Sequence, residues 1–443
     1  MPVGIELRDF VCPKCGANAR LDGRFIQWCT DCGHNADPYP PQPGKRERRR
    51  TEREQQRSTR LFESLRSARN LRPTSVAGVA VTAISGVVHL IGLAVLVLPI
   101  LFIAHGGGGF WPGVVLVLCL LTFLAVRPRM PQRRLEPSKG VDRATAPAFY
   151  ELLDRCAAEL GCAVPAQVRI DLRYNASTGR SGLRQRSYLV LGMPLWTVLS
   201  GRERIALLGH ELAHQVNGDT THGLWAASAR GSLDAWTRLL DPRQTALERQ
   251  SKRRTIRFAG RRNGGGLGAM LAPVVMAVLF APFFLITLGC RALLTRLDLH
   301  CGQRAEYLAD ELGARLAGSE AAHGLLAKLA LSESVSGYLT ASKNRHKTTR
   351  GTKREDAAVE LWASVAEYID SVPETERQRR RIVDRLRNTR TDRSHPANHL
   401  RSALIEARPQ LPGVLKLSED EWAAIDAELA PGYREAARRL LGA

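Results

Sequence analysis

The sequence lacks the features of an exported protein. Its first ten residues, MPVGIELRDF, contain neither a basic start nor an apolar core, so they do not resemble a secretory signal peptide. We therefore expect the N-terminus to stay in the cytoplasm. No internal repeats occur along the 443 residues, and this length is sufficient for two or three domains.

A disulfide framework is also missing. In a chain expected to be intracellular, nine cysteines indicate metal ligands or free thiols rather than disulfides. Four of them form one cluster near the N-terminus. The remaining five show no pairing pattern, and we interpret them as packing residues: Cys119, Cys156, Cys162, Cys290 and Cys301.

The chain has fewer acidic than basic residues. It contains 43 Asp and Glu and 64 Lys and Arg, which gives a formal net charge of +21. Much of the excess lies beside apolar segments, at 45–72, 127–134 and 252–262. A basic chain without long apolar stretches would suggest nucleic acid. Here the placement favours the inner leaflet of a membrane, where positive flanks fix orientation. We therefore expect a lipid bilayer as a partner and do not expect nucleic acid.

Formal charge is absent from Val76–Ala104, which is 29 residues long. About 20 helical residues cross a hydrocarbon layer of roughly 30 Å, so this segment is long enough to span it. A second apolar run, Phe110–Val126, follows a short uncharged loop. Because both outer flanks are basic, the pair is predicted to form a membrane hairpin with both ends in the cytoplasm. The alternative is two buried helices of a soluble core.

A histidine-rich motif provides the first sign of chemistry. The pattern H-E-x-x-H occupies positions 210–214, on a helix predicted for 203–216. Residues at i and i+4 project from one helical face, so His210 and His214 can reach the same zinc ion. Glu211 can then serve as the general base that takes a proton from the attacking water. The alternative is a helix with two exposed histidines.

A catalytic zinc site needs a third protein ligand. Glu306 is the best candidate, and Asp310 lies one turn later on the same predicted helical face, where it can orient a ligand histidine. His222 and His300 compete for the ligand role. An E-x-x-x-D pair alone is weak evidence, because charged helices supply many such pairs on solvated faces.

These motifs together resemble a known family. The segment 209–219 (GHELAHQVNGD), followed by an apolar stretch and RAEYLADELGA, is similar to the HtpX-type integral-membrane zinc endopeptidases, a gluzincin-like family that includes the CAAX prenyl proteases. The resemblance implies that both motif histidines and Glu306 bind zinc, with Asp310 beside them. It further implies hydrolysis of protein or peptide substrates, and a role in membrane-protein quality control.

Two weaker matches extend the resemblance to about residues 75–405. Asn175 corresponds to the family's Asn-Ala segment on an edge strand beside the active site. His395 and Arg401 correspond to a C-terminal His-Pro-Pro…Arg segment, although Ala397 replaces the second proline. In the family this histidine and arginine lie near the substrate and help to stabilise the oxyanion. A surface turn is the alternative interpretation of this segment.

Membrane orientation is a difficulty for this site, because its two halves must lie on the same side. Only one clearly apolar stretch, 267–294, separates them, and its 28 residues are too few for two crossings, which need about 40. We predict that this stretch bends at Pro282 and enters the membrane without crossing, or that it packs against the first hairpin.

The N-terminal cysteine cluster predicts a second zinc ion. Two C-x₂-C pairs, 13 residues apart, suit tetrahedral Zn²⁺ in a closed structural site. Gly16 and Gly33, one after each pair, allow the tight turns of thiolate knuckles. The expected ligands are Cys12, Cys15, Cys29 and Cys32. This unit is interpreted as a docking module whose partner the resemblance does not supply.

The expected fold class is mainly α with a small β-sheet. The expected organisation comprises a zinc ribbon at 1–35, a Pro-rich and basic linker at 36–74, a transmembrane hairpin at 75–128, a metallopeptidase domain in two parts at 129–266 and 296–443, and between them a membrane-associated segment at 267–295. The expected function is that of a multi-pass membrane zinc endopeptidase with a cytoplasmic catalytic domain, one catalytic and one structural Zn²⁺. The alternative is a non-catalytic membrane scaffold that recruits a partner through its ribbon and carries a decayed peptidase domain.

Overall fold

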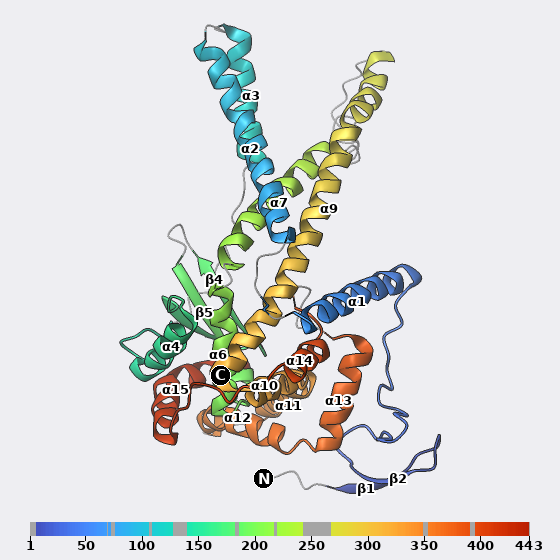
Figure 1. The fold of residues 1–443 in the computed structure, drawn as a ribbon, viewed down its shortest axis with the longest axis vertical. Coiled ribbons are helices and arrows are strands. Elements are labelled where there is room, and N and C mark those ends of the chain that lie inside the picture. Colours follow the sequence, from blue (N-terminus) through green and yellow to red (C-terminus); the bar gives the residue numbers. More distant parts are fainter. Residues whose placement is uncertain are drawn as a thin grey trace. The chain divides into compact units, whose positions relative to one another are not determined.

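The computed structural model forms two compact units (Figure 1). The first unit comprises Met1–Pro73, Arg134–Thr220 and Gly302–Ala443, and the second comprises Thr74–Arg133 and Thr221–Cys301. The residues described are 6–68, 70–71, 76–105, 109–126, 140–181, 186–216, 219–241, 267–348, 353–389 and 395–442. The basic runs at 127–134 and 252–262 lie outside these residues.

The N-terminal part of the first unit begins with a small hairpin. Strands β1 (Leu7–Val11) and β2 (Asn18–Asp22) pair antiparallel. The first cysteine pair lies in the turn between them. A Pro-rich linker leads to the basic helix α1 (Lys45–Arg66), whose only apolar stripe is a short one near its C-terminal end.

A three-stranded sheet provides the β-structure of the peptidase part. Its order is β3 (Gln167–Asp171), β5 (Arg186–Gly192), β4 (Ala176–Ser181). Strand β3 runs parallel to β5, whereas β4 runs antiparallel to it and forms an edge of the described sheet. Apolar residues alternate along β3 and fill most of β5, and both patterns are typical of strands. The residues of β4, ASTGRS, are small or polar, and they show no alternation of apolar and polar residues that would indicate a strand.

Helices form the rest of the first unit, so the prediction of a mainly α fold with a small sheet is confirmed. Helix α6 (Gly201–Val216) lies in its core and contacts α4 and α10. The apolar stripe predicted for this helix is buried at Ile205, Leu208 and Leu212. The other helices are α4 (Pro147–Leu160), α5 (Met193–Trp196), α10 (Ser319–Leu329), α11 (Ser332–Thr348), α12 (Lys353–Asp370), α13 (Glu374–Arg387), α14 (Asn398–Ala407) and α15 (Glu419–Leu441).

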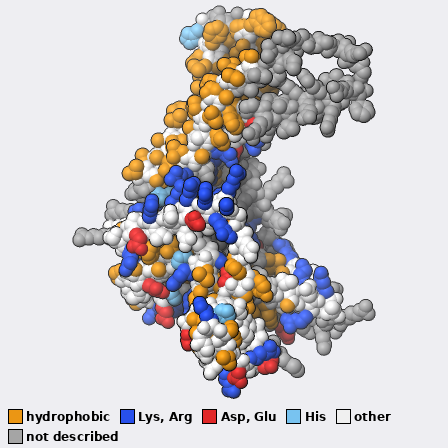
Figure 2. All heavy atoms as spheres, turned by 90° about the vertical axis from the view of Figure 1, so that its right-hand side faces the viewer, with side chains coloured by type: hydrophobic (Ala, Val, Ile, Leu, Met, Phe, Trp, Pro, Cys, Tyr) orange, Lys and Arg blue, Asp and Glu red, His pale blue; other side chains and the backbone are white. Residues whose placement is uncertain are grey.

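The described part of the second unit consists of helices, of which α2 and α3 are strongly apolar. Helix α2 (Val76–Ala104) is followed by α3 (Phe110–Val126), and α7 (Asp219–Leu240) packs with α2 around a small cluster that includes Val81, Val88 and Leu233. Figure 2 shows hydrophobic side chains gathered over these helices. Most apolar side chains of α2 and α3 are exposed, which is unlike the core helices of a soluble protein. Among the described residues, two helices are long and apolar enough to cross a membrane, Val76–Ala104 and Val278–Ala317.

Helix α9 (Leu267–Ala317) is 51 residues long and belongs to both units. It continues as one helix through Pro273 and through Pro282, the position at which a bend was predicted. A proline removes one backbone hydrogen bond, and an apolar helix retains its remaining bonds on both sides. The expected domain boundary at residue 295 consequently falls inside a continuous helix. Leu294 belongs to the same apolar cluster as Val81 and Val88 of α2, as expected if this segment packs against the first hairpin.

Two ion pairs join α7 to α9 within the second unit. Arg230 pairs with Asp298, and Asp234 pairs with Arg291. Two of the charged side chains that make α7 a poor membrane span, Arg230 and Asp234, are therefore matched by opposite charges on a neighbouring helix.

Candidate active site

The site forms where α6 and α9 cross at a pair of glycines. A Cβ atom on Gly209 would lie 3.0 Å from Cα of Gly313. A Cβ atom on Gly313 would lie 2.8 Å from the carbonyl oxygen of Ala206, closer than real Cβ contacts allow. Only glycine permits this close approach of the two backbones. The approach brings His210, the residue after Gly209, next to the acidic residues of α9.

Three side chains that the sequence predicted as ligands meet at this crossing. Nε2 of His210 lies 3.4 Å from one carboxylate oxygen of Glu306, and Nε2 of His214 lies 3.5 Å from the other oxygen. Glu306 and His210 are almost completely buried, whereas His214 is slightly more exposed. One carboxylate therefore faces both imidazoles of the H-E-x-x-H motif.

These separations fit ligands of a shared ion better than hydrogen-bond partners. Hydrogen bonds between nitrogen and oxygen are typically 2.7–3.2 Å long, with a mode near 2.9 Å. Ligand atoms about 2.05 Å from a tetrahedral zinc ion are about 3.4 Å apart. Both nitrogen–oxygen distances to Glu306 match that spacing. The donor set of two imidazoles and a carboxylate is also one that zinc takes in catalytic sites.

The electrostatics of the site favour a cation. Burial lowers the pKa of His210, but hydrogen bonds to Asp310 and Glu306 outweigh burial and raise this pKa to about 10. Burial raises the pKa of Glu306, but the positive charges of His395 and His214 hold it well below its ordinary value. The carboxylates thus remain ionised in a buried place, where they stabilise positive charge between the rings.

Asp310 orients His210 through the ring nitrogen that does not face Glu306. Its Oδ1 atom lies 3.0 Å from Nδ1 of His210, which fixes the ring and leaves Nε2 directed toward Glu306. Arg401 of α14 donates two hydrogen bonds to the same carboxylate, of 2.8 and 2.6 Å. The charge of Arg401 lowers the pKa of Asp310 against the opposing effect of burial. His210, Asp310 and Arg401 are therefore linked by buried hydrogen bonds that the charges of these groups strengthen.

The position of Arg401 corrects one expectation. The resemblance placed this arginine near the substrate, at the oxyanion. In the structure its side chain is only 3% exposed and its guanidinium group bonds to Asp310. Arg401 thus contacts the residue that orients His210, and its guanidinium group also lies 4.0 Å from Oε2 of Glu306.

His395 approaches the site from the segment before α14. Its Nδ1 atom lies 2.6 Å from Oε2 of Glu306, and its ring stacks against that of His210 with centroids 6.5 Å apart. His395, His210 and Glu306 form one of two groups of potential metal ligands among the described residues. The neighbouring Ser394, part of the motif that predicted this histidine, lies outside the described residues.

The edge strand β4 lies beside the catalytic helix. Thr178 of β4 donates a hydrogen bond of 3.1 Å from its hydroxyl to the carbonyl oxygen of Glu211. Glu211 itself is buried on α6. Asn175 lies immediately before β4, where its carbonyl oxygen accepts a 3.0 Å bond from the N–H of Gly192. Sequence reasoning missed Thr178, because a single threonine in a polar strand carries no recognisable signal.

Three residues were candidates for the third ligand: Glu306, His222 and His300. The distances from Glu306 to both motif imidazoles support Glu306 in this role.

The second group of potential ligands is the four-cysteine cluster near the N-terminus. Its sulfur atoms lie within 4.8 Å of one another, with Cys12 and Cys32 3.6 Å apart and Cys15 and Cys29 3.5 Å apart. Thiolates about 2.3 Å from a tetrahedral zinc ion are about 3.8 Å apart, so the cluster fits this metal. Gly16 and Gly33 adopt positive φ angles of 74° and 69°, which confirms the predicted knuckle turns.

Comparison with known proteins agrees with this geometry. No solved structure matches the chain. Residues 150–408, more than half of the chain, match the profile of peptidase family M48. The matched span includes His210, Glu306 and Arg401, and it excludes the cysteine cluster and helices α2 and α3. The resemblance inferred from the motifs is thus confirmed: the chain belongs to peptidase family M48, whose members are metal-dependent peptidases.

Proposed function

We propose that this protein is a membrane-bound, zinc-dependent endopeptidase, with His210, His214 and Glu306 as the ligands of its catalytic zinc. The observation that carries this proposal is the pair of distances, 3.4 and 3.5 Å, from the two imidazole Nε2 atoms to the two oxygens of Glu306. A helix with two unrelated surface histidines would not direct both rings at one buried carboxylate.

The side chains around these ligands have separable roles. When bound, zinc supplies a Lewis acid that polarises the scissile carbonyl and lowers the pKa of water. Glu211 is the general base, which takes a proton from the attacking water and passes it to the leaving amine. Asp310 keeps His210 in the tautomer and orientation that its ligand role requires, and Arg401 keeps Asp310 ionised.

His395 contacts the same carboxylate oxygen of Glu306 that faces His210. We assign it to the stabilisation of negative charge on the substrate during the reaction, in keeping with the resemblance. Its contact of 2.6 Å with Glu306 supports this role, because it holds the ring at the metal site itself. The oxyanion role expected of Arg401 is not part of this proposal.

The substrate is a protein or peptide in extended conformation. Strand β4 is an edge of the described sheet, and an extended segment can pair with such an edge through its main chain. The bond from Thr178 to the backbone of Glu211 couples this strand to the catalytic helix. Asn175, at the start of β4, is positioned at the end of this proposed binding strand.

Helices α2, α3 and α9 are proposed to place the protein in the cell membrane as a multi-pass protein with the catalytic part in the cytoplasm. Their exposed apolar side chains support this location. Whether α9 crosses the bilayer stays a prediction. A peptidase held at this surface would meet misfolded membrane proteins, so we propose quality control of such proteins as its biological role.

Metal content and cleavage together test the proposal on the purified full-length chain. We expect two zinc ions per chain in the wild type and one in His214→Ala. Glu211→Gln should keep both ions and lose cleavage of casein. A Glu211→Gln protein that cleaves casein like the wild type would refute the assignment of the base. Two ions retained in His214→Ala would refute the ligand set and favour a non-catalytic scaffold with a decayed domain.

A further inference from the structure

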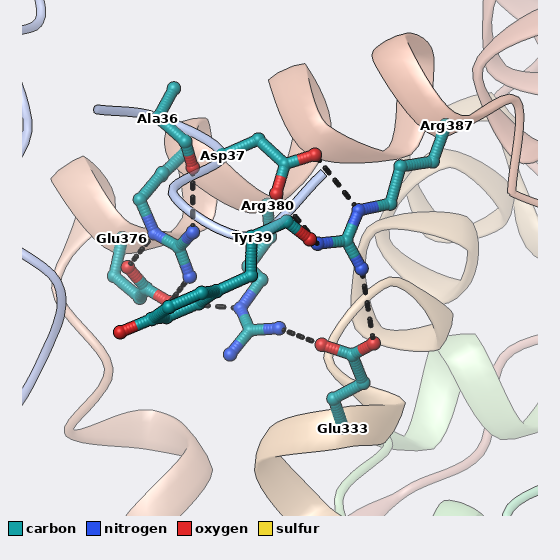
Figure 3. A network of polar contacts seen from close by, with 8 residues as sticks. Ala36, Asp37, Tyr39, Glu333, Glu376, Arg380 and Arg387 are labelled. Atoms are coloured by element: carbon teal, nitrogen blue, oxygen red, sulfur yellow. Dashed lines mark hydrogen bonds and ion pairs between the residues drawn. The ribbon is translucent and has the colours of Figure 1, made fainter. Parts of the chain in front are cut away.

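The cysteine cluster and α1 form an N-terminal extension, residues 6–68, that lies outside the span matched to the peptidase family. The extension contacts the C-terminal helices of its own chain through arginines (Figure 3). Arg387 of α13 donates two hydrogen bonds to the carboxylate of Asp37, of 2.9 and 2.6 Å, and a third to the carbonyl oxygen of Tyr39. The Asp37 side chain is only 8% exposed, and the bond from Arg387 lowers its pKa.

A second contact involves a buried arginine. Arg379 of α13 is 4% exposed and paired with Glu376, and its Nη1 atom donates a 2.8 Å bond to the carbonyl oxygen of Ala36. Without the extension this buried charged group would lose a hydrogen-bond acceptor, which is costly for a buried cation. The extension also contributes Arg24, which is held by Asp22 and donates to the hydroxyl and carbonyl of Ser371 after α12.

The groups that make these contacts are positioned by the cysteine knuckles. Ala36 and Asp37 come directly after the second knuckle, and the N–H of Ala36 bonds to the carbonyl oxygen of Gly33. The ribbon buries few large apolar residues, chiefly Leu21 and Trp28. A unit of about 35 residues with so small a core depends on its metal to fold. The docking surface for α13 therefore exists only while the four cysteines hold a metal.

The other end of the extension contacts the residues beside the active site. Leu61, Phe62 and Leu65 of α1 form an apolar cluster with Tyr307, Leu400 and Leu404. Tyr307 follows the proposed ligand Glu306, and Leu400 precedes Arg401. Helix α1 thus packs against both α9 and α14 at the level of the site.

Helices α13 and α14 are themselves linked. The carboxylate of Asp384 in α13 accepts a 3.1 Å bond from the N–H of His399 in the first turn of α14. The N–H of Asn398 also bonds to the carbonyl oxygen of Thr389, just after α13. The position of α13 consequently sets the start of α14, three residues before Arg401.

We propose that the N-terminal extension is a metal-dependent clamp on α13 and α14 of its own chain, which holds Arg401 against Asp310. The partner of the zinc ribbon is therefore the peptidase part of the same molecule. Only the consequence for cleavage rests on the proposed function; the docking and its dependence on the cysteine-bound metal do not.

Charge reversal at Asp37 tests the clamp on the full-length chain. Asp37→Arg should raise amide hydrogen exchange in α13 and α14 at least tenfold, because it places two arginines opposite each other, while the cysteine site keeps its zinc. The double variant Asp37→Arg/Arg387→Asp should restore most of the protection. Asp9→Arg is the matched control, since Asp9 forms an exposed ion pair with Arg20 on the same ribbon, and it should leave exchange in α13 and α14 unchanged.

Loss of the structural metal tests the second half of the proposal. Cys15→Ser should lose one zinc ion and show the same rise in exchange in α13 and α14. Unchanged exchange in Asp37→Arg, or no recovery in the double variant, would overturn the clamp. Unchanged exchange in a Cys15→Ser protein that has lost its zinc would overturn the metal dependence.

The experiments can refute the clamp and the endopeptidase function independently of each other. Repeating the exchange measurements in a Glu211→Gln background removes any contribution from cleavage. An exchange effect without peptidase activity in the wild type would leave the clamp intact and refute the endopeptidase. With both proposals correct, Asp37→Arg should lower kcat/KM about tenfold and weaken retention of the catalytic zinc, and the double variant should recover both.

Discussion

Gly209 of α6 and Gly313 of α9 face each other where the two helices cross, with backbone atoms so close that a methyl group at Gly313 does not fit and one at Gly209 would be crowded. The first glycine precedes the H-E-x-x-H motif, and the second follows Asp310 by three residues. The distance between the two halves of the site is thus set by two residues that have no chemistry of their own.

Gly313→Ala should weaken the catalytic site. The new Cβ would lie 2.8 Å from the carbonyl oxygen of Ala206, so the helices must separate by a few tenths of an ångström. We expect a loss of about 1–3 kcal/mol in stability and a lower zinc affinity, measured by competition with a chelator. Gly337→Ala in α11 is the matched control, because nothing lies within 4 Å of its Cβ position. Equal zinc affinity in both variants would contradict the role of the crossing.

Arg401→Met should lower zinc affinity about 10- to 100-fold, because Asp310 would lose the partner that holds it on His210. Arg408→Met is the control. Arg408, at the C-terminal end of α14, also joins this helix to α9, through an ion pair of 3.1 Å with Glu311, which is not one of the proposed ligands. Chelator titration of both variants separates a specific effect at the site from a general loosening of α14. The zinc affinity of Arg401→Lys should lie between those of Arg401→Met and Arg408→Met, since lysine keeps the charge and loses the two-point contact.

The sequence singled out the three side chains that meet at the helix crossing, because local spacing determines most of this candidate set. His210 and His214 share a helical face at any position in a fold, and Glu306 and Asp310 repeat that relation on a second helix. Arg401 was predicted to face the substrate, because a motif names a residue and does not say which way it points. Its contact with Asp310 depends on the packing of α14, more than 90 residues away in sequence.

The fold was predictable to a similar extent. Apolar runs indicated the mainly α class, and the residue patterns of β3 and β5 are typical of strands. Strand β4 was not evident from composition, because its stability comes from pairing with β5 rather than from its own side chains. Helix α9 continues through Pro282, where a bend was predicted, because neighbouring groups can compensate for a proline in an apolar helix. The docking of the ribbon depends on single long-range contacts, such as that between Arg387 and Asp37, which no local pattern encodes.

Asp384→Asn should change the pH dependence of stability. Burial raises the pKa of Asp384 from 3.8 to about 6, so folding favours its protonated form. The wild type therefore keeps its full stability from this group below about pH 4, loses stability as the pH rises to about 6, and changes no further above that. The total corresponds to about 3 kcal/mol. Asparagine does not titrate and can still accept the bond from His399.

Thermal unfolding of Asp384→Asn and the wild type at a series of pH values measures this effect. The variant's melting temperature relative to the wild type should rise between pH 4 and 6 and stay level from pH 6 to 8. A constant difference over the whole range would show that the carboxyl does not titrate in this window.

Extraction of membranes with alkaline carbonate tests the proposed location. The full-length chain should remain in the membrane pellet, because the apolar side chains exposed on α2 and α3 would otherwise face water. A protein held at the surface only by its basic residues would be released by carbonate or by high salt. Recovery of the chain in the supernatant would contradict a membrane-spanning hairpin.

The edge position of β4 has a consequence for selectivity. Main-chain pairing requires an extended polypeptide and depends little on the identity of its side chains. A stably folded protein has few unpaired strands to offer, since native proteins protect their edges. An enzyme that recruits substrates along β4 would therefore discriminate by conformational state, sparing intact neighbours and degrading the same chains once they have lost their structure.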